Sequence, residues 1–311
     1  MGLHRLLGLS VSVPDPEGLA AYYGELGLTA DGAGGFGGTD GGTQVHVAEG
    51  PFRRLLHVDV AADDEATLAG AAARATDLGA THAWQDGVLH LTDPHTQVTF
   101  RLQVAERWNQ PAVAAPARDN RPGSPERRNA RAAGVTAQPR PPRRLGHMVI
   151  GSPNLAASRD FLLQVVGFKM SDQMEGIIAF TRCSTDHHNV ALVESPVPLL
   201  QHYSWECDDV DHVGHTATKL LRADPERQVW GFGRHFLGSN YYWYLRDPAG
   251  SFVELYSDMD VIDDDEEWET HGASTFGPEH IANAWGPNLP LEFIIPNDLE
   301  VLKAGWGAME G

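Results

Sequence analysis

The chain has 311 residues, a length typical of two domains, and its 42% of hydrophobic residues suffices for packed cores. Its formal net charge of -19 would repel a phosphate backbone, so we expect no nucleic-acid partner. The chain has only two cysteines, no apolar run near the roughly 20 residues that a bilayer requires, and no export signal at its N-terminus, and we therefore expect a cytoplasmic protein without a membrane segment.

Four modules follow one another along the chain, and each opens with a predicted strand, continues with a helix and ends with two or three more strands. They span residues 3–50, 53–104, 144–196 and 198–258. Apolar residues recur at three- and four-residue spacing in the helical stretches, whereas Asp-Pro and Gly turns separate the strands. This order, repeated in pairs, predicts an α+β fold in which four βαβββ modules pair into two cupped-sheet domains.

The modules predict a chain with four parts. Residues 1–110 form the first domain, 111–143 a linker rich in Arg and Pro, 144–270 the second domain, and 271–311 a tail that packs on the domains. The composition of the linker is typical of a solvated connection between domains, which we favour over a role in binding a partner.

The second pair of modules repeats the sequence pattern of the first. The segment Leu7–Pro14 aligns with Leu145–Ser152, and the opening strands of the second and fourth modules align likewise. Near the end of each pair an Asp-Pro turn leads, at the same offset, to Phe100 in the first pair and to Glu254 in the second. The repeat therefore allows positions in the two halves to be compared.

Three residues of the second pair, His147, His202 and Glu254, each lie in a short predicted strand. Two imidazoles and one carboxylate are the ligand set that holds Fe(II) on one face and leaves the opposite positions open for substrate and O2. Taken singly, each histidine is more often a core or surface residue than a ligand. Their placement at repeat-equivalent positions favours a metal site.

The first pair lacks this ligand set. The aligned positions there are Leu9, His57 and Phe100, and one histidine without partners is a poor metal site. We therefore expect the first domain to be metal-free and structural, and the second to carry the chemistry.

A further group of polar residues lies close to the same strands. His188 precedes a strand, His235 follows a Gly-Arg pair, and Tyr244 lies in an aromatic strand. Each has a structural alternative, since His235 could cap a turn and Tyr244 could be a core tyrosine. Of the adjacent pair His187 and His188, we expect His187 at the surface.

Two more histidines, His212 and His215, lie on a predicted helix among several aspartates and resemble a metal-binding pair. We favour a solvated helix face for them, because charged and polar residues at helical spacing are usually exposed.

The second half resembles the type I extradiol catechol dioxygenases of the vicinal oxygen chelate superfamily, which includes glyoxalases and bleomycin resistance proteins. The stretches that carry the resemblance are Gly146-His147, His187–Leu192, Gln201–Tyr203, Gly233–His235, Tyr244–Gly250 and Phe252–Tyr256. The first half is similar to the metal-free N-terminal domain of two-domain members, so the likeness covers residues 3–258. The linker is longer than the usual connection in that family.

The resemblance implies a role for each candidate. The trio of two histidines and Glu254 would bind Fe(II), or Mn(II), which suits the same ligands. His188 would be the acid/base residue beside the O2 site, and His235 and Tyr244 would hydrogen-bond to oxygens of the bound substrate. The implied partners are a catechol-type small molecule and O2, the implied reaction is ring cleavage next to the two hydroxyls, and the implied assembly is a homo-oligomer.

Two other functional classes remain open, because one fold supports several chemistries. A metal-dependent isomerase or transferase of the same superfamily would usually need a fourth protein ligand or a second carboxylate base. A non-catalytic ligand-binding member would generally lack the complete trio.

Overall fold

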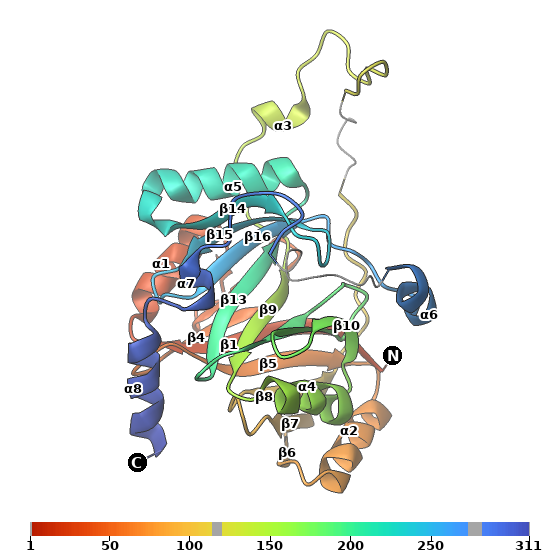
Figure 1. Ribbon diagram of the computed structural model, residues 1–311, viewed down its shortest axis with the longest axis vertical. Coiled ribbons are helices and arrows are strands. Elements are labelled where there is room, and N and C mark those ends of the chain that lie inside the picture. Colours follow the sequence, from red (N-terminus) through yellow and green to blue (C-terminus); the bar gives the residue numbers. More distant parts are fainter. Residues whose placement is uncertain (1, 114–119, 273–281, 311) are drawn as a thin grey trace.

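The computed structural model describes residues 2–113, 120–272 and 282–310. It contains two mixed eight-stranded sheets, with strand orders β2-β3-β4-β1-β5-β8-β7-β6 and β10-β11-β12-β9-β13-β16-β15-β14 (Figure 1). Corresponding strands have the same relative directions, because β1/β4 and β5/β8 are parallel, as are β9/β12 and β13/β16. The predicted α+β fold with a repeated module order is confirmed.

The first sheet and its helices come from the first third of the chain. Their bounds are β1 Leu3–Val13, α1 Pro16–Leu26, β2 Thr29–Ala30, β3 Gly35–Gly37, β4 Val45–Glu49, β5 Arg54–Ala62, α2 Glu65–Asp77, β6 His82–Gln85, β7 Val88–Thr92 and β8 Thr99–Val104. Helix α1 begins where the Asp15 side chain accepts the Gly18 amide and ends at Gly27, whose φ of 96° is costly for other residues.

The second sheet repeats this plan. Its elements are β9 Leu145–Ser152, α4 Leu155–Asp160, the π-helical turn Phe161–Val166, β10 Lys169–Met174, β11 Ile178–Arg182, β12 Val190–Glu194, β13 Leu199–Glu206, α5 Val210–Ala223, the 3-10 turn Pro225–Arg227, β14 Gln228–Arg234, β15 Tyr241–Arg246 and β16 Phe252–Ser257. Strands β9, β13 and β16 lie side by side at the centre of this sheet. Their side chains are almost all buried, as expected of strands covered on both faces.

The remaining helices belong to the linker and to the chain after the second sheet. They are α3 Ala133–Thr136, α6 Asp265–Glu267 with its π-helical extension Trp268–Gly272, α7 Leu291–Ile294 and α8 Leu299–Glu310. Figure 1 shows α3 beside α5, and α8 beside the first sheet. No helix in the described parts of the chain is long and apolar enough to cross a membrane.

Helix α5 corrects one expectation. His212 is 1% exposed rather than solvated, and it faces the linker with Nε2 3.0 Å from the Arg140 carbonyl oxygen. The half-buried His215 makes a similar contact with the Gly134 carbonyl oxygen at 2.6 Å. Both histidines therefore connect helix α5 to residues 134 and 140 of the linker. Among the described residues, neither belongs to a group that could hold a metal ion.

Most buried hydrophobic residues of both sheets belong to one continuous cluster. The Tyr23 hydroxyl on α1 donates to the Tyr203 hydroxyl on β13 at 3.0 Å, and the Tyr203 hydroxyl donates in turn to Asp247 at 2.9 Å. Arg74 on α2 reaches the carbonyl oxygens of the π-helical turn at 3.3 Å. The two halves are thus packed against each other through apolar and polar contacts.

The register of the strands corrects the predicted correspondence between the two halves. Glu254 on β16 lies opposite the second residue after His202 on β13. On β8, Arg101 lies opposite the second residue after His57 on β5. Arg101, and not Phe100, therefore occupies the position of Glu254.

The same correction applies to the opening strands. Leu9 on β1 and Met148 on β9 are the residues that begin the parallel pairing with the neighbouring strand. Gly8 is therefore the counterpart of His147, and Leu9 lies on the opposite face, in the core. A slip of one residue exchanges the two faces of a strand, which explains why the aligned residues proved to be core residues.

An ion pair occupies the centre of the first cup. Arg101 contacts Asp59 through two hydrogen bonds of 2.5 and 2.6 Å, beside His57 on the same strand as Asp59. A guanidinium at the position where the second cup has a carboxylate repels a metal cation. The charge of the first cup thus disfavours a metal there.

Candidate metal centre

Three neighbouring strands bring His147, His202 and Glu254 together. One oxygen of Glu254, Oε2, lies 2.7 Å from His147 Nε2 and 3.7 Å from His202 Nε2. One ligand atom from each residue lies within 4.8 Å of the others, and all three side chains are buried. A single cation can therefore contact all three residues.

The Glu254 carboxylate is fully buried. Ser204 Oγ donates to one of its oxygens at 2.7 Å, and Asn240 Nδ2 donates to the other at 3.0 Å. Burial acts to raise the pKa of Glu254, but the His147 imidazole, in hydrogen-bond contact with Oε2, holds it well below its usual range. Within the described residues no Lys or Arg pairs with this carboxylate, and a buried anion without a cationic partner is costly. The donor set therefore fits a divalent metal.

The adjacent side chain of Gln201 orients His202. The Gln201 Oε1 atom contacts His202 Nδ1, and because an amide oxygen can only accept, the imidazole carries its proton on Nδ1. The Gln201 amide nitrogen donates to the Phe293 carbonyl oxygen at 2.9 Å, which fixes the direction of the amide. Burial lowers the pKa of His202 to about 3. His202 is thus a neutral imidazole with a bare Nε2, the form that binds metals.

His147 is held by packing. Its ring lies 4.9 Å from the Tyr256 ring and 4.2 Å from the His188 ring, and its Nδ1 has no hydrogen-bond partner among the described residues. A Cβ at Gly146 would lie 1.8 Å from the Tyr256 hydroxyl, so only glycine fits before this histidine. The residue type preceding His147 therefore follows from the packing of Tyr256.

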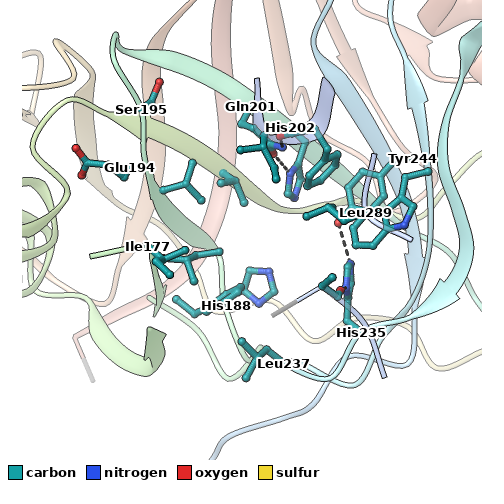
Figure 2. A pocket seen from close by; sticks show the side chains of 18 of the residues that line it. Ile177, His188, Glu194, Ser195, Gln201, His202, His235, Leu237, Tyr244 and Leu289 are labelled. Atoms are coloured by element: carbon teal, nitrogen blue, oxygen red, sulfur yellow. Dashed lines mark hydrogen bonds between the residues drawn. The ribbon is translucent and has the colours of Figure 1, made fainter. Parts of the chain in front are cut away.

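His188 lines the same cavity as His202 (Figure 2). Burial, with the neighbouring His147 imidazole, lowers the pKa of His188 well below its usual value. The expectation that His187 lies at the surface is wrong, because its side chain is 0% exposed. It lies behind His188, with the two Nδ1 atoms 3.0 Å apart.

His235 and Tyr244 form a hydrogen-bonded pair on the opposite wall (Figure 2). His235 Nδ1 donates to the Ala282 carbonyl oxygen at 2.7 Å, so its Nε2 is bare and accepts the Tyr244 hydroxyl at 2.9 Å. Burial raises the pKa of Tyr244 well above its usual value and keeps the phenol protonated. The predicted alternative in which His235 only caps a turn does not account for this contact with Tyr244.

The cavity has a volume of about 460 Å³, and its wall is largely apolar. Its polar lining consists of the histidines, Tyr244, Asn240 and Gln201, with Glu194 and Ser195 on the side away from His235 and Tyr244 (Figure 2). The apolar lining comes from both the sheet and the tail: Val149, Ile177, Ile178, Phe180, Val193, Leu199, Leu237, Leu289, Phe293, Ile294 and Pro296. The aromatic residues Phe180 and Tyr244 line the cavity, whereas Phe252 does not and stacks on Phe293 with ring centroids 5.2 Å apart.

Residues 144–255 match the Glyoxalase/Bleomycin resistance protein/Dioxygenase superfamily. This segment contains the three candidate ligands, and the chain carries a domain of this superfamily.

Two characterised relatives share this half of the chain. Metapyrocatechase 2 from Cupriavidus necator is 39% identical over 155 residues, which cover 49% of this chain and 47% of that protein. The 2,2',3-trihydroxybiphenyl dioxygenase from Sphingomonas paucimobilis is 31% identical over 156 residues, covering 47% of this chain and 50% of that protein. The chain therefore spans about half the length of the curated relatives it matches.

A solved structure extends the likeness in fold to both halves. The Mn(II)-bound glyoxalase from Novosphingobium aromaticivorans has a TM-score of 0.66 and 22% identity, covering 92% of this chain and 97% of that one. At this level of identity the likeness shows the fold, which is that of the vicinal oxygen chelate superfamily expected from the sequence.

Several residues around the site were not predicted from the sequence. Ser204 could have been found, because it lies two residues after His202 and shares its face of the strand. Asn240 and Gln201 gave no periodic signal, since one lies before a strand and the other is identified only by its contact with an imidazole. Phe293 comes from the tail, whose position no local pattern defines.

Proposed function

We propose that the protein is an extradiol dioxygenase, which cleaves the ring of a catechol-type substrate with O2 next to the two hydroxyls. The observation that carries the proposal is the convergence of two imidazoles and one buried carboxylate within 4.8 Å, with both imidazoles lining a large and mostly apolar cavity. The two relatives named above, a metapyrocatechase and a trihydroxybiphenyl dioxygenase, support it.

In this proposal His147, His202 and Glu254 hold Fe(II), with Mn(II) as the alternative that suits the same donors. A bound metal of this kind lowers the pKa of the catechol hydroxyls and lets the electron-rich ring react with O2. Ser204 and Asn240 orient the Glu254 carboxylate, and Gln201 keeps the His202 Nε2 atom unprotonated.

The remaining polar residues act on substrate and protons. His188 is a neutral imidazole facing the cavity, so it can take and return a proton at Nε2 during the reaction. His235 and Tyr244 lie together on the other wall, where the Tyr244 hydroxyl and the His235 imidazole orient the oxygens of the substrate.

The cavity wall defines the class of catechol. None of the described residues that line it is Lys or Arg, and Glu194 lies among them, so a carboxylate on the substrate would find no partner. A volume of about 460 Å³ with apolar walls suits a catechol that carries an apolar group or a second ring. We propose neutral, apolar-substituted catechols as substrates.

The domain organisation belongs to the same proposal. Residues 1–110 and 144–270 are two domains joined by the linker 111–143, and residues 271–311 form a tail that contributes part of the cavity wall. The first domain, with Arg101 at the position of Glu254, serves as a structural partner of the second.

The test is an aerobic assay of Fe(II)-loaded and Mn(II)-loaded protein on catechol, 3-methylcatechol, 2,3-dihydroxybiphenyl and 3,4-dihydroxyphenylacetate. We expect yellow ring-opened product with one O2 consumed per product, and higher kcat/KM for the neutral substituted catechols than for the carboxylated one. His202→Ala removes activity and bound metal, whereas the matched control His57→Ala, at the equivalent position of the first cup, retains both. Absence of O2 uptake with every catechol, while metal is bound, would favour an isomerase or transferase instead.

A further inference from the structure

A chain of hydrogen bonds lies behind His188, on the side away from the cavity. His188 Nδ1 lies 3.0 Å from His187 Nδ1, and His187 Nε2 lies 2.8 Å from Asp172 Oδ2. All three side chains are buried, with Asp172 9% exposed. No described residue forms a hydrogen bond with His188 Nε2, the ring nitrogen that is left to face the cavity.

The direction of each hydrogen bond in this series is fixed by the last acceptor, the Asp172 carboxylate. A carboxylate can only accept, so His187 carries its proton on Nε2 and donates it to Asp172. If His187 carries this one proton only, its Nδ1 atom is bare and can only accept from His188 Nδ1. A neutral His188 with its proton on Nδ1 has an unprotonated Nε2.

Local backbone features hold the two outer members in place. The register of β10 against β11 shifts between Met170 and Asp172, and this bulge turns the Asp172 side chain toward His187. The His187 ring packs between Phe180 and Trp268, whose ring centroids lie 5.7 and 5.4 Å away. Asp172 also lines a second hollow of about 420 Å³ on the far side of the site, together with Asp260.

We propose that Asp172 and His187 are positioning residues, which hold His188 in the Nδ1-protonated tautomer and thereby direct a bare Nε2 into the cavity. The role rests on the proposed dioxygenase function, because it is at Nε2 that His188 would accept a proton from substrate. Neither residue touches the three candidate ligands, and His187 was expected to lie at the surface.

The direct test is the tautomer of His188 in the full chain labelled with 15N-histidine and loaded with diamagnetic Zn(II). The His188 signals are identified by their loss in His188→Gln. We expect the Nδ1-protonated form in the wild type. In Asp172→Asn the amide can donate as well as accept. The donor and acceptor roles of the two histidines can then be exchanged, and His188 becomes a mixture of tautomers.

A kinetic measurement complements the spectroscopic one. With Fe(II) and 2,3-dihydroxybiphenyl, we expect Asp172→Asn to lower kcat by at least about tenfold with little change in KM, since a base in the wrong tautomer cannot accept the proton. Asp260→Asn is the matched control, because it removes one carboxylate from the same hollow whose side-chain partner is Ser239. The backbone carbonyl of Asp260, which accepts the His187 amide at 2.9 Å, is kept, so the substitution should leave tautomer and kcat unchanged.

Two results would overturn the proposal: an Nε2-protonated His188 in the wild type, or an unaltered Nδ1-protonated His188 in Asp172→Asn. The spectrum does not depend on turnover. A protein that lacks ring-cleaving activity but shows the expected change of tautomer would therefore refute the dioxygenase function and leave the role of Asp172 and His187 standing.

Discussion

At the residue scale, the site places the neutral imidazoles of His202 and His188 near one buried anion, Glu254. Burial lowers the pKa of His202 to about 3 and that of His188 well below its usual value, whereas Glu254 stays ionised. The protein thus maintains each group in the protonation state that a metal ligand or a base needs. These groups resist protonation in the folded state but not in the unfolded chain, so protons stabilise the unfolded chain at low pH.

This difference in protonation predicts how the stability of the metal-free protein depends on pH. The unfolded chain takes up protons on its histidines below about pH 6.5, whereas folded His202 does so only near pH 3, so the free energy of unfolding falls as the pH is lowered between these values. Urea unfolding of the chelator-treated protein at several pH values measures the slope. In His202→Gln we expect the slope to decrease by up to about 1.4 kcal/mol per pH unit. An identical slope in both proteins would contradict the prediction.

At the element scale, helix α7 and Pro296, two residues after it, complete the cavity. The Phe293 ring lies 4.8 Å from Tyr244 and 5.9 Å from His202. The segment is fixed by Arg53 of the first half, which is 5% exposed and binds Asp298 through hydrogen bonds of 2.6 and 2.9 Å. Arg53 also donates to the Leu200 carbonyl oxygen at 2.7 Å. The first half thus supports one wall of the candidate site.

Removal of this contact should weaken the protein as a whole. In Arg53→Met the Asp298 carboxylate and the Leu200 carbonyl oxygen lose their donor, and we expect the free energy of unfolding to decrease by about 1–3 kcal/mol. The expected decrease in the free energy of unfolding is modest because Asp298 is 29% exposed and can be hydrated. Arg107→Met is the matched control, since its ion pair with Asp63 lies on the surface, and urea unfolding should show no measurable change. Equal effects of the two substitutions would contradict the role of Arg53.

The helices and strands also show which parts of the fold could be predicted from the sequence. The four modules, their order and the trio of candidate ligands follow from alternation, turn residues and the repeat. The positions equivalent to Glu254 and His147 were displaced by one residue. For Glu254 the cause is the turn before the strand, because five residues (94–98) separate Asp93 from β8 and four (248–251) separate Asp247 from β16. His187 and His212 were placed at the surface because their partners, Asp172 and the Arg140 carbonyl oxygen, come from other segments.

At the scale of the whole molecule, the two sheets share one core. The main buried cluster contains residues of both halves, and the Tyr23–Tyr203–Asp247 hydrogen bonds join them through buried hydroxyls. Separation of the halves would expose this apolar surface and leave these polar groups without partners.

We therefore expect the protein to unfold in one cooperative transition rather than as two domains. Differential scanning calorimetry should give a single peak whose calorimetric and van't Hoff enthalpies agree. Tyr23→Phe removes a buried hydroxyl that bridges the halves and should lower Tm while the single peak is retained. Two resolved transitions in the wild type would show that the halves are independently stable.

The Arg101–Asp59 pair in the first cup has a consequence for the history of the molecule. The two sheets have the same strand arrangement, but the first has the cationic Arg101 where the second has the anionic Glu254. A duplicated half could therefore lose cation binding and remain as a structural support. Recovery of a second centre would require replacement of Gly8 and Arg101 together, because a new ligand beside a guanidinium would gain no metal. Intermediates with only one of the two changes would lose the ion pair or gain nothing, which would oppose the recovery of a second metal centre.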